Sequence, residues 1–212
     1  MKKIIAFTWL IALCNITHAQ AKIVQYFKKL PAEQQHGYKI NFKNNQYNVV
    51  ADNQCSITVD EKNGYLKIID DGTGGGTFVL ELAIFKKENK TDILAVNTYA
   101  YSGDGKEGGS IAFFDVAQNM TDVSMSVWPD FGYIEDLLTN GVTKKDIEPY
   151  ASTEYTYAQL PQQGTTILFN IGFKSLDAAC SEGNKKACTL QKKLQPVKLL
   201  WDKKIATFNL SN

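Results

Sequence analysis

Residues 55–85, CSITVDEKNGYLKIIDDGTGGGTFVLELAIF, decide the fold of this chain. Cys55–Asp60 and Tyr65–Asp70 are short runs of apolar and β-branched residues bounded by turn residues, as expected of strands. Asn63-Gly64 lies between them and accepts positive φ angles at low cost, so the two strands are expected to form a hairpin. A glycine-rich turn then leads into a third strand, Thr77–Phe85. Consecutive strands joined by short turns predict an antiparallel sheet.

The same pattern continues on both sides of this stretch. Upstream, apolar and polar residues alternate over 38–49, with an interruption at Asn44-Asn45. Downstream, further strands are predicted at Asp92–Tyr101, Ser110–Val116 and Asp122–Trp128, separated by turns rich in Gly, Asn or Lys. About eight short strands with short connections predict a mainly β fold. We expect an antiparallel up-and-down meander, barrel- or sandwich-like, with a few short helices.

The pattern changes after Pro129, where helix and strand are expected to mix. We predict a helix at Tyr133–Asn140 closed by Gly141, a polar connecting segment at 142–163, a strand at Thr165–Phe173, partly helical structure at Leu176–Leu194, and a last hairpin of Pro196–Trp201 with Lys204–Leu210. Near the N-terminus, residues 21–30 predict a short amphipathic helix that ends at Pro31. We treat residues 20–212 as a single mainly β domain, with the meander over about 38–128 and a helix-containing part at 129–212.

The first 19 residues have the pattern of a secretory signal peptide. A charged start, the apolar run Ile4–Cys14 and small residues up to Ala19 are what a signal peptidase recognises. Cleavage is expected after Ala19, with a cut after Ala21 as the alternative. A lipid anchor on Cys14 is disfavoured because Leu13 stands where such cleavage sites need Gly or Ala. The mature chain is therefore expected to be soluble and exported, either periplasmic or extracellular.

The charges restrict the partners. The formal net charge is +1, and all 23 basic residues are lysine. A nearly neutral chain has no electrostatic reason to bind nucleic acid, and without arginine it lacks the bidentate contact that reads guanine edges. His36 is the one histidine beyond the expected signal, which argues against zinc sites built from several histidines. No later segment is apolar over about 18 residues, so no membrane span is expected.

Three cysteines follow the expected signal peptide. Paired cysteines normally bridge in an oxidising compartment, and Cys180 and Cys188 flank a short polar loop that a disulfide would close. Cys55 is then left as a free thiol, which we expect to be buried. The alternative, a thiol nucleophile with His36 as its base, has no supporting motif.

The glycine-rich segment 72–76 favours a turn over a nucleotide site, because a strand follows it where a phosphate-binding loop needs a helix. Asp70, Asp71 and Asp104 offer the oxygen ligands that calcium prefers, but their spacing is not that of an EF-hand. We expect solvated turn acids, with a calcium site built from two loops as the alternative. No other cofactor or metal is expected.

Alternate turns of a meander emerge at the same end of the sheet. Loops 71–76, 102–109 and 129–132 should therefore be neighbours, with turns 87–91 and 117–121 at the opposite end. The candidate binding residues at the first end are Asp70, Asp71, Asp104, Lys106, Glu107, Trp128, Asp130 and Phe131. Such a surface is typical of an interaction site, in which aromatic residues anchor and charges steer. The alternative is that Trp128 and Phe131 pack in the core.

Two classes of function fit these observations. The favoured one is an exported soluble binding protein, an inhibitor or immunity-type partner of a periplasmic or secreted enzyme, with another protein as its partner. It is favoured because the sequence carries no catalytic signature. The alternative is a glycan-binding module, or a carboxylate-dependent hydrolase that uses the same loops. Glycoside hydrolysis would need two acids about 5–10 Å apart on either side of a sugar.

Overall fold

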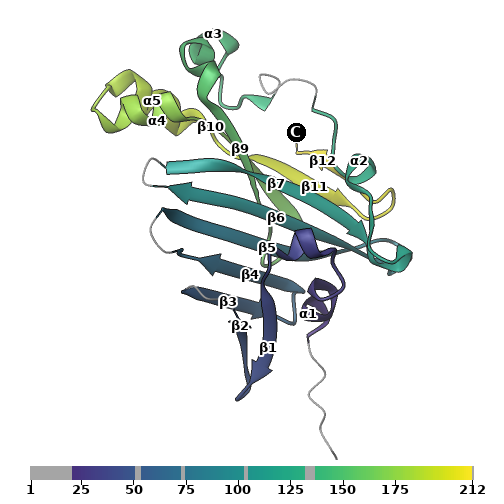
Figure 1. The fold of residues 1–212 in the computed structure, drawn as a ribbon. Coiled ribbons are helices and arrows are strands. Elements are labelled where there is room, and N and C mark those ends of the chain that lie inside the picture. The colour runs from purple at the N-terminus through teal and green to yellow at the C-terminus, as the bar shows by residue number, and fades with distance from the viewer. Residues whose placement is uncertain (1–20, 51–53, 73–74, 103–104, 132–136, 212) are drawn as a thin grey trace, which may run out of the picture.

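A computed structural model describes residues 21–50, 54–72, 75–102, 105–131 and 137–211 of the chain. Their strands form three antiparallel sheets, and the helices between them are short (Figure 1). The mainly β, antiparallel, sandwich-like class predicted from the sequence is confirmed. Within the described ranges, no helix combines the length and the apolar character needed to cross a membrane.

The largest sheet is a meander in which each strand pairs with the next strand along the chain. Its strands are β3 (Cys55–Asp60), β4 (Tyr65–Asp70), β5 (Gly76–Lys86), β6 (Asp92–Ser102), β7 (Gly105–Asp115) and β8 (Thr121–Asp122). The pairs Cys55↔Asp70 and Asp60↔Tyr65 confirm the predicted hairpin. Gly64 has a φ of 65°, a left-handed conformation that a residue without Cβ adopts at low cost.

The N-terminal elements cover one face of this sheet. They are α1 (Lys22–Phe27), the 3-10 helix η1 (Ala32–Gln35), and a hairpin of β1 (Lys39–Lys43) and β2 (Gln46–Val50). Ile23 and Phe27 of α1 join a core that also holds Ile40 of β1 and Leu80 and Leu94 of the meander. Residues 38–49 were predicted to begin the meander, but they form a separate two-stranded sheet. Their apolar side chains pack on the same face of the larger sheet as α1.

The opposite face of the meander packs against a second sheet, so the fold is layered. This sheet has the order β12-β11-β10-β9 and consists of β9 (Glu154–Gln159), β10 (Thr166–Phe173), β11 (Val197–Asp202) and β12 (Thr207–Leu210). The core between the sheets includes Phe85 and Phe113 of the meander and Ile167, Leu199 and Phe208 of the second sheet. In Figure 1, β9 to β12 cross the meander near the edge at which β7 lies.

The strand predicted at Asp122–Trp128 is wrong beyond its first residue. β8 ends at Asp122, after the 3-10 helix η2 (Val116–Gln118), and the chain enters α2 (Ser124–Val127). The backbone N–H of Ser124 donates to Oδ1 of Asp122 at 2.8 Å, and the backbone N–H of Phe113 donates to Oγ of Ser124 at 2.8 Å. The first hydrogen bond is local and offers the backbone an alternative to the strand ladder, and the second holds Ser124 against β7 where α2 begins.

The C-terminal part carries its own small core beside the sandwich. Its helices are α3 (Lys144–Ile147), the 3-10 helix η4 (Glu148–Thr153), α4 (Lys174–Ser181) and α5 (Lys185–Lys193). Ile147, Phe173, Leu176 and Ala187 are buried together between them. The connecting segment predicted at 142–163 is therefore wrong, since it contains α3, η4 and β9. The partly helical structure and the last hairpin are confirmed. Residues 133–136 of the predicted helix lie outside the described residues.

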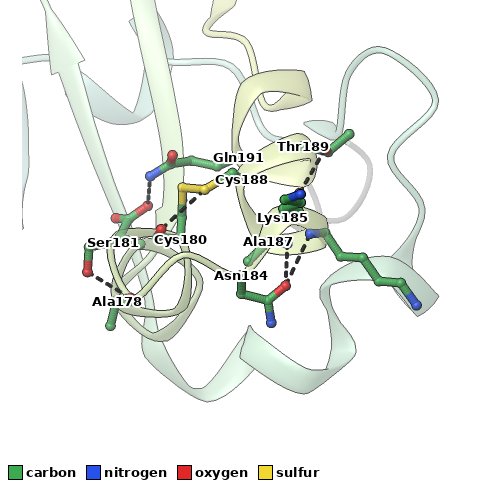
Figure 2. The surroundings of a disulfide bond; sticks show 11 residues. Ala178, Cys180, Ser181, Asn184, Lys185, Ala187, Cys188, Thr189 and Gln191 are labelled. Atoms are coloured by element: carbon green, nitrogen blue, oxygen red, sulfur yellow. Dashed lines mark hydrogen bonds between the residues drawn. A yellow bond between two sulfur atoms is a disulfide. The ribbon is translucent and has the colours of Figure 1, made fainter.

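The predicted disulfide joins Cys180 to Cys188, and Cys55 is a free, half-buried thiol. Figure 2 shows the bond linking the last turn of α4 to α5. Next to it, Oδ1 of Asn184 accepts hydrogen bonds from the backbone N–H groups of Lys186 and Ala187 and so caps α5.

Removing this disulfide, as Cys180→Ser with Cys188→Ser, is expected to lower the free energy of unfolding by about 2.5 kcal/mol. The bond closes a short loop, so the loss of unfolded-state entropy that it imposes is moderate. Urea denaturation followed by circular dichroism measures the change. Cys55→Ser is the control and keeps the disulfide. Equal stability of the double variant and the wild type would contradict the expectation.

Candidate functional site

Two of the three predicted loops lie at one end of the meander. Gly76, which begins β5, pairs with Ser102, which ends β6. The β4–β5 and β6–β7 connections are therefore neighbours, as predicted. The loop predicted at 102–109 is wrong over most of its length, because β7 begins at Gly105 rather than at Ser110. Turns 87–91 and 117–121 follow β5 and β7 at the opposite end of the sheet.

The acids predicted for this end have different surroundings. Asp70 is buried; its Oδ2 accepts a hydrogen bond from the Tyr38 hydroxyl at 2.8 Å and its Oδ1 accepts one from Gly72 N at 2.9 Å. Burial, together with the hydrogen bond to Asp70, raises the pKa of Tyr38, which remains a donor. Asp70 thus links the turn after β4 to Tyr38, the residue that precedes β1. Asp71, Glu107 and Asp130 are exposed, Asp104 lies outside the described residues, and Lys106 is described only by its backbone.

Trp128 and Phe131 lie away from these loops. The Trp128 ring packs against Phe113 at 5.8 Å, and Phe131 stacks on Phe169 at 5.5 Å between ring centroids. Phe113 pairs with Ala95 of β6, about seven residues or roughly 20 Å along that strand from its end at Ser102. Because β8 stops at Asp122, the chain does not return to the predicted end. The structure therefore brings the β4–β5 and β6–β7 connections together without the two aromatic residues.

The structure also bears on the two alternatives, a Cys55 nucleophile with His36 as its base and a metal site. Burial lowers the pKa of His36, whose ring packs against Phe78 at 5.1 Å. Burial and the carboxylate of Asp70 raise the pKa of Cys55, which disfavours the thiolate that a nucleophile needs. In the part of the chain that the structure describes, no three His, Cys, Asp or Glu side chains are grouped so that they could hold a metal ion.

A cavity of about 800 Å³ lies at the opposite end of the meander, between the β3–β4 turn and the β11–β12 hairpin. We call it the lysine-rimmed cleft. Its lining includes Lys62, Ile84, Lys86, Leu200, Trp201, Asp202, Lys203 and Lys204. This volume falls within the range of about 300–1,000 Å³ that is usual for ligand-binding pockets.

The cleft combines apolar side chains with a positive rim. Leu200, an apolar residue of β11, is 44% exposed. The Trp201 indole Nε1 donates to the backbone oxygen of Lys86 at 2.9 Å, which fixes the ring beside the cleft. The sequence does contain a signal for this surface. Leu199, Leu200 and Trp201 are consecutive apolar residues, and in a strand the middle one must face away from the other two.

A buried polar cluster joins the two sheets at Glu81, which is 3% exposed. Its Oε1 accepts hydrogen bonds from the Tyr65 hydroxyl at 3.0 Å and from the Tyr99 hydroxyl at 3.2 Å. The same oxygen lies 3.4 Å from Lys67 Nζ. Its Oε2 accepts hydrogen bonds from Asn97 Nδ2 and from the backbone N–H of Leu160, both at 3.1 Å. Burial raises the pKa of both tyrosines, and the charge on Glu81 raises it further, so both remain donors. An acid within the apolar strand FVLELAIF was the sequence signal for this cluster.

Comparison with known protein families finds no match, and no curated protein matches the sequence. Among solved structures, a domain of an uncharacterized protein from Porphyromonas gingivalis W83 is similar, with a TM-score of 0.59 and 11% sequence identity. The similarity covers 91% of this chain and 99% of that domain. At this identity, the chain is similar to the Porphyromonas gingivalis domain in fold.

Proposed function

We propose that this chain is an exported binding protein, an inhibitor or immunity-type partner of a periplasmic or secreted enzyme, and that the lysine-rimmed cleft holds an acidic segment of that partner. One observation carries the proposal: a half-exposed apolar residue, Leu200, lies in a concave surface whose rim is built of lysines. Protein interfaces place apolar anchors at the centre of the buried patch and polar or charged groups around it.

The charges of the cleft support an acidic partner. Lysines at positions 62, 86, 203 and 204 line it, against Asp202 as the acid. Oδ1 of Asp202 already accepts a hydrogen bond from the backbone N–H of Lys204 at 2.8 Å. Exposed charges of one sign attract a partner of the opposite sign and raise the association rate. An acidic segment with an apolar side chain for Leu200 and Trp201 would match both properties of the cleft.

The proposal is tested with a partner captured from the exported fraction of the native cell and then purified. Leu200→Ala is expected to raise the Kd by about 30-fold, the effect of losing a central anchor. Lys203→Glu with Lys204→Glu is expected to slow association and reduce its dependence on salt, because rim charges steer the encounter. Surface plasmon resonance measures the Kd and both rates.

Val50→Ala is the matched control, because Val50 is 52% exposed on β2 and does not line the cleft. It should leave the Kd unchanged. The free energy of unfolding of each variant is measured alongside, so that lost stability is not taken for lost binding. If the purified partner bound Leu200→Ala as tightly as the wild type, or bound the doubly acidic variant faster, the cleft would not be its site.

A further inference from the structure

A second hollow surrounded by lysines lies in the helical C-terminal part. It has a volume of about 570 Å³ and lies between α3 and η4 on one side and α5 on the other. We call it the helical hollow. The charged and hydroxyl side chains of its lining are Lys145, Asp146, Tyr150, Lys185, Lys186, Thr189 and Lys193. This hollow is separate from the lysine-rimmed cleft, so the inference that follows does not depend on the proposed function.

Both walls of the hollow are held in place. On the α3 side, Oδ2 of Asp146 accepts hydrogen bonds from the backbone N–H and the hydroxyl of Thr143, at 2.8 and 2.6 Å, and caps the helix. On the α5 side, the disulfide and a 2.7 Å hydrogen bond from Gln191 Nε2 to Asp177 Oδ1 join α5 to α4 (Figure 2). Buried Ile147 and Ala187 lie in the core shared by the two walls. The lysines are thus presented by fixed elements.

The positive charges of the hollow are only partly balanced by the acid among the described residues of its lining. Among the described residues, Lys145, Lys185, Lys186 and Lys193 form no ion pair with a carboxylate. Asp146 is the one acid among the lining residues that the structure describes. Hydrogen bonds from Thr143 lower its pKa, and the charges of Lys193 and Lys145 lower it further, so it stays ionised at neutral pH. Four positive charges therefore face one negative charge, and the excess favours an anion.

We propose that the helical hollow binds a ligand through an oxyanion group that carries two or more negative charges, the chemistry of a phosphate or sulfate group. Lysine ammonium groups bind such anions as compact point charges and need no bidentate geometry. The Tyr150 hydroxyl, which has no hydrogen-bond partner among the described residues, adds a neutral donor at the same place. The backbone N–H groups that begin α5 are already capped by Asn184, so the side chains supply the contacts.

Pyrophosphate and sulfate are the two probes, each added to the full chain and compared with sodium chloride at equal ionic strength. At about 100 times its Kd, a bound anion is expected to raise the Tm by about 5 °C more than chloride does. A response to pyrophosphate alone identifies a phosphate group, and an equal response to sulfate identifies the wider oxyanion chemistry. If neither anion raises the Tm more than chloride, the proposal is wrong.

The variant Lys145→Gln with Lys193→Gln locates the site. Each lost charge is expected to weaken binding about fivefold, and the pair about 25-fold, as isothermal titration calorimetry measures. Lys39→Gln with Lys43→Gln, which changes two exposed lysines of β1 that line neither the helical hollow nor the lysine-rimmed cleft, is the matched control and should keep the Kd within about twofold. Equal losses in the two double variants would show non-specific attraction and overturn the proposal.

Amide chemical shifts in the wild type give a second test that needs no variant to fold. Added pyrophosphate should shift the amide signals of residues 142–150 and 185–193, which frame the hollow. Shifts confined to other parts of the chain would overturn the proposal, whatever the stability of the lysine variants.

Discussion

Replacing Glu81 by alanine is expected to lower the free energy of unfolding by about 3–5 kcal/mol, the loss typical when one partner of a buried ion pair is removed. The substitution leaves the hydroxyls of Tyr65 and Tyr99 and the backbone N–H of Leu160 buried without their acceptor. Each unsatisfied buried donor costs about 1–3 kcal/mol. Lys67 contributes less, because its side chain is 28% exposed and can turn toward water.

Glu81→Gln separates the role of the carboxylate from that of its volume. The amide keeps the size of the side chain but places a donor where an oxygen accepted hydrogen bonds. We expect a loss of about 2–3 kcal/mol, measured by urea denaturation at neutral pH. Glu107→Ala, which changes an exposed acid of β7, should cost less than about 0.5 kcal/mol. A glutamine variant as stable as the wild type would show that the cluster does not need the acid.

Phe208→Ala is expected to cost about 3–5 kcal/mol as well, for a different reason. Phe208 is 1% exposed, and its ring lies 5.0 Å from Phe85, 5.5 Å from Phe113 and 5.0 Å from Trp201 between ring centroids. It therefore fills the core between the meander and the second sheet. Truncation leaves a cavity among rigid aromatic rings that cannot close it, so both transfer energy and packing are lost.

Leu210→Ala, on the same strand, is the matched control. Leu210 is 43% exposed, so its truncation should cost less than about 1 kcal/mol. Thermal and urea denaturation of both variants decide the comparison. Similar losses for the two residues would mean that β12 contributes through its backbone pairing rather than through the Phe208 ring.

The parts of the fold that could be predicted are those determined by local sequence. Asn63-Gly64 fixes a turn by itself, and the hairpin on either side of it has the predicted pairing. The failure at Asp122–Trp128 has a local cause and a non-local one. Val123, Met125 and Val127 alternate with polar residues and so resemble a strand, but only Val127 is buried, and Met125 is 98% exposed. Hydrogen bonds of Asp122 and Ser124 with nearby backbone groups outweigh that alternation.

The candidate site was harder to predict, because it depends on how distant segments meet. The grouping of loops 71–76 and 102–109 followed from the meander alone, whereas Trp128 was placed with them through a strand that does not form. The lysine-rimmed cleft joins the β3–β4 turn to the β11–β12 hairpin. Periodicity within either segment says nothing about that contact, although Leu200 marks one side of it.

The position of Glu81 also has a consequence for the order in which the chain folds. Every strand of the meander pairs with its neighbour in sequence, so this sheet can grow by successive short loop closures. The polar cluster is different, because Asn97 binds the backbone oxygen of Ala158, 61 residues away, and Glu81 binds Leu160, 79 residues away. Glu81 therefore stays hydrated on an open sheet until β9 has been made and docks. Glu81 thus loses its hydration water late in folding, when the second sheet packs over it.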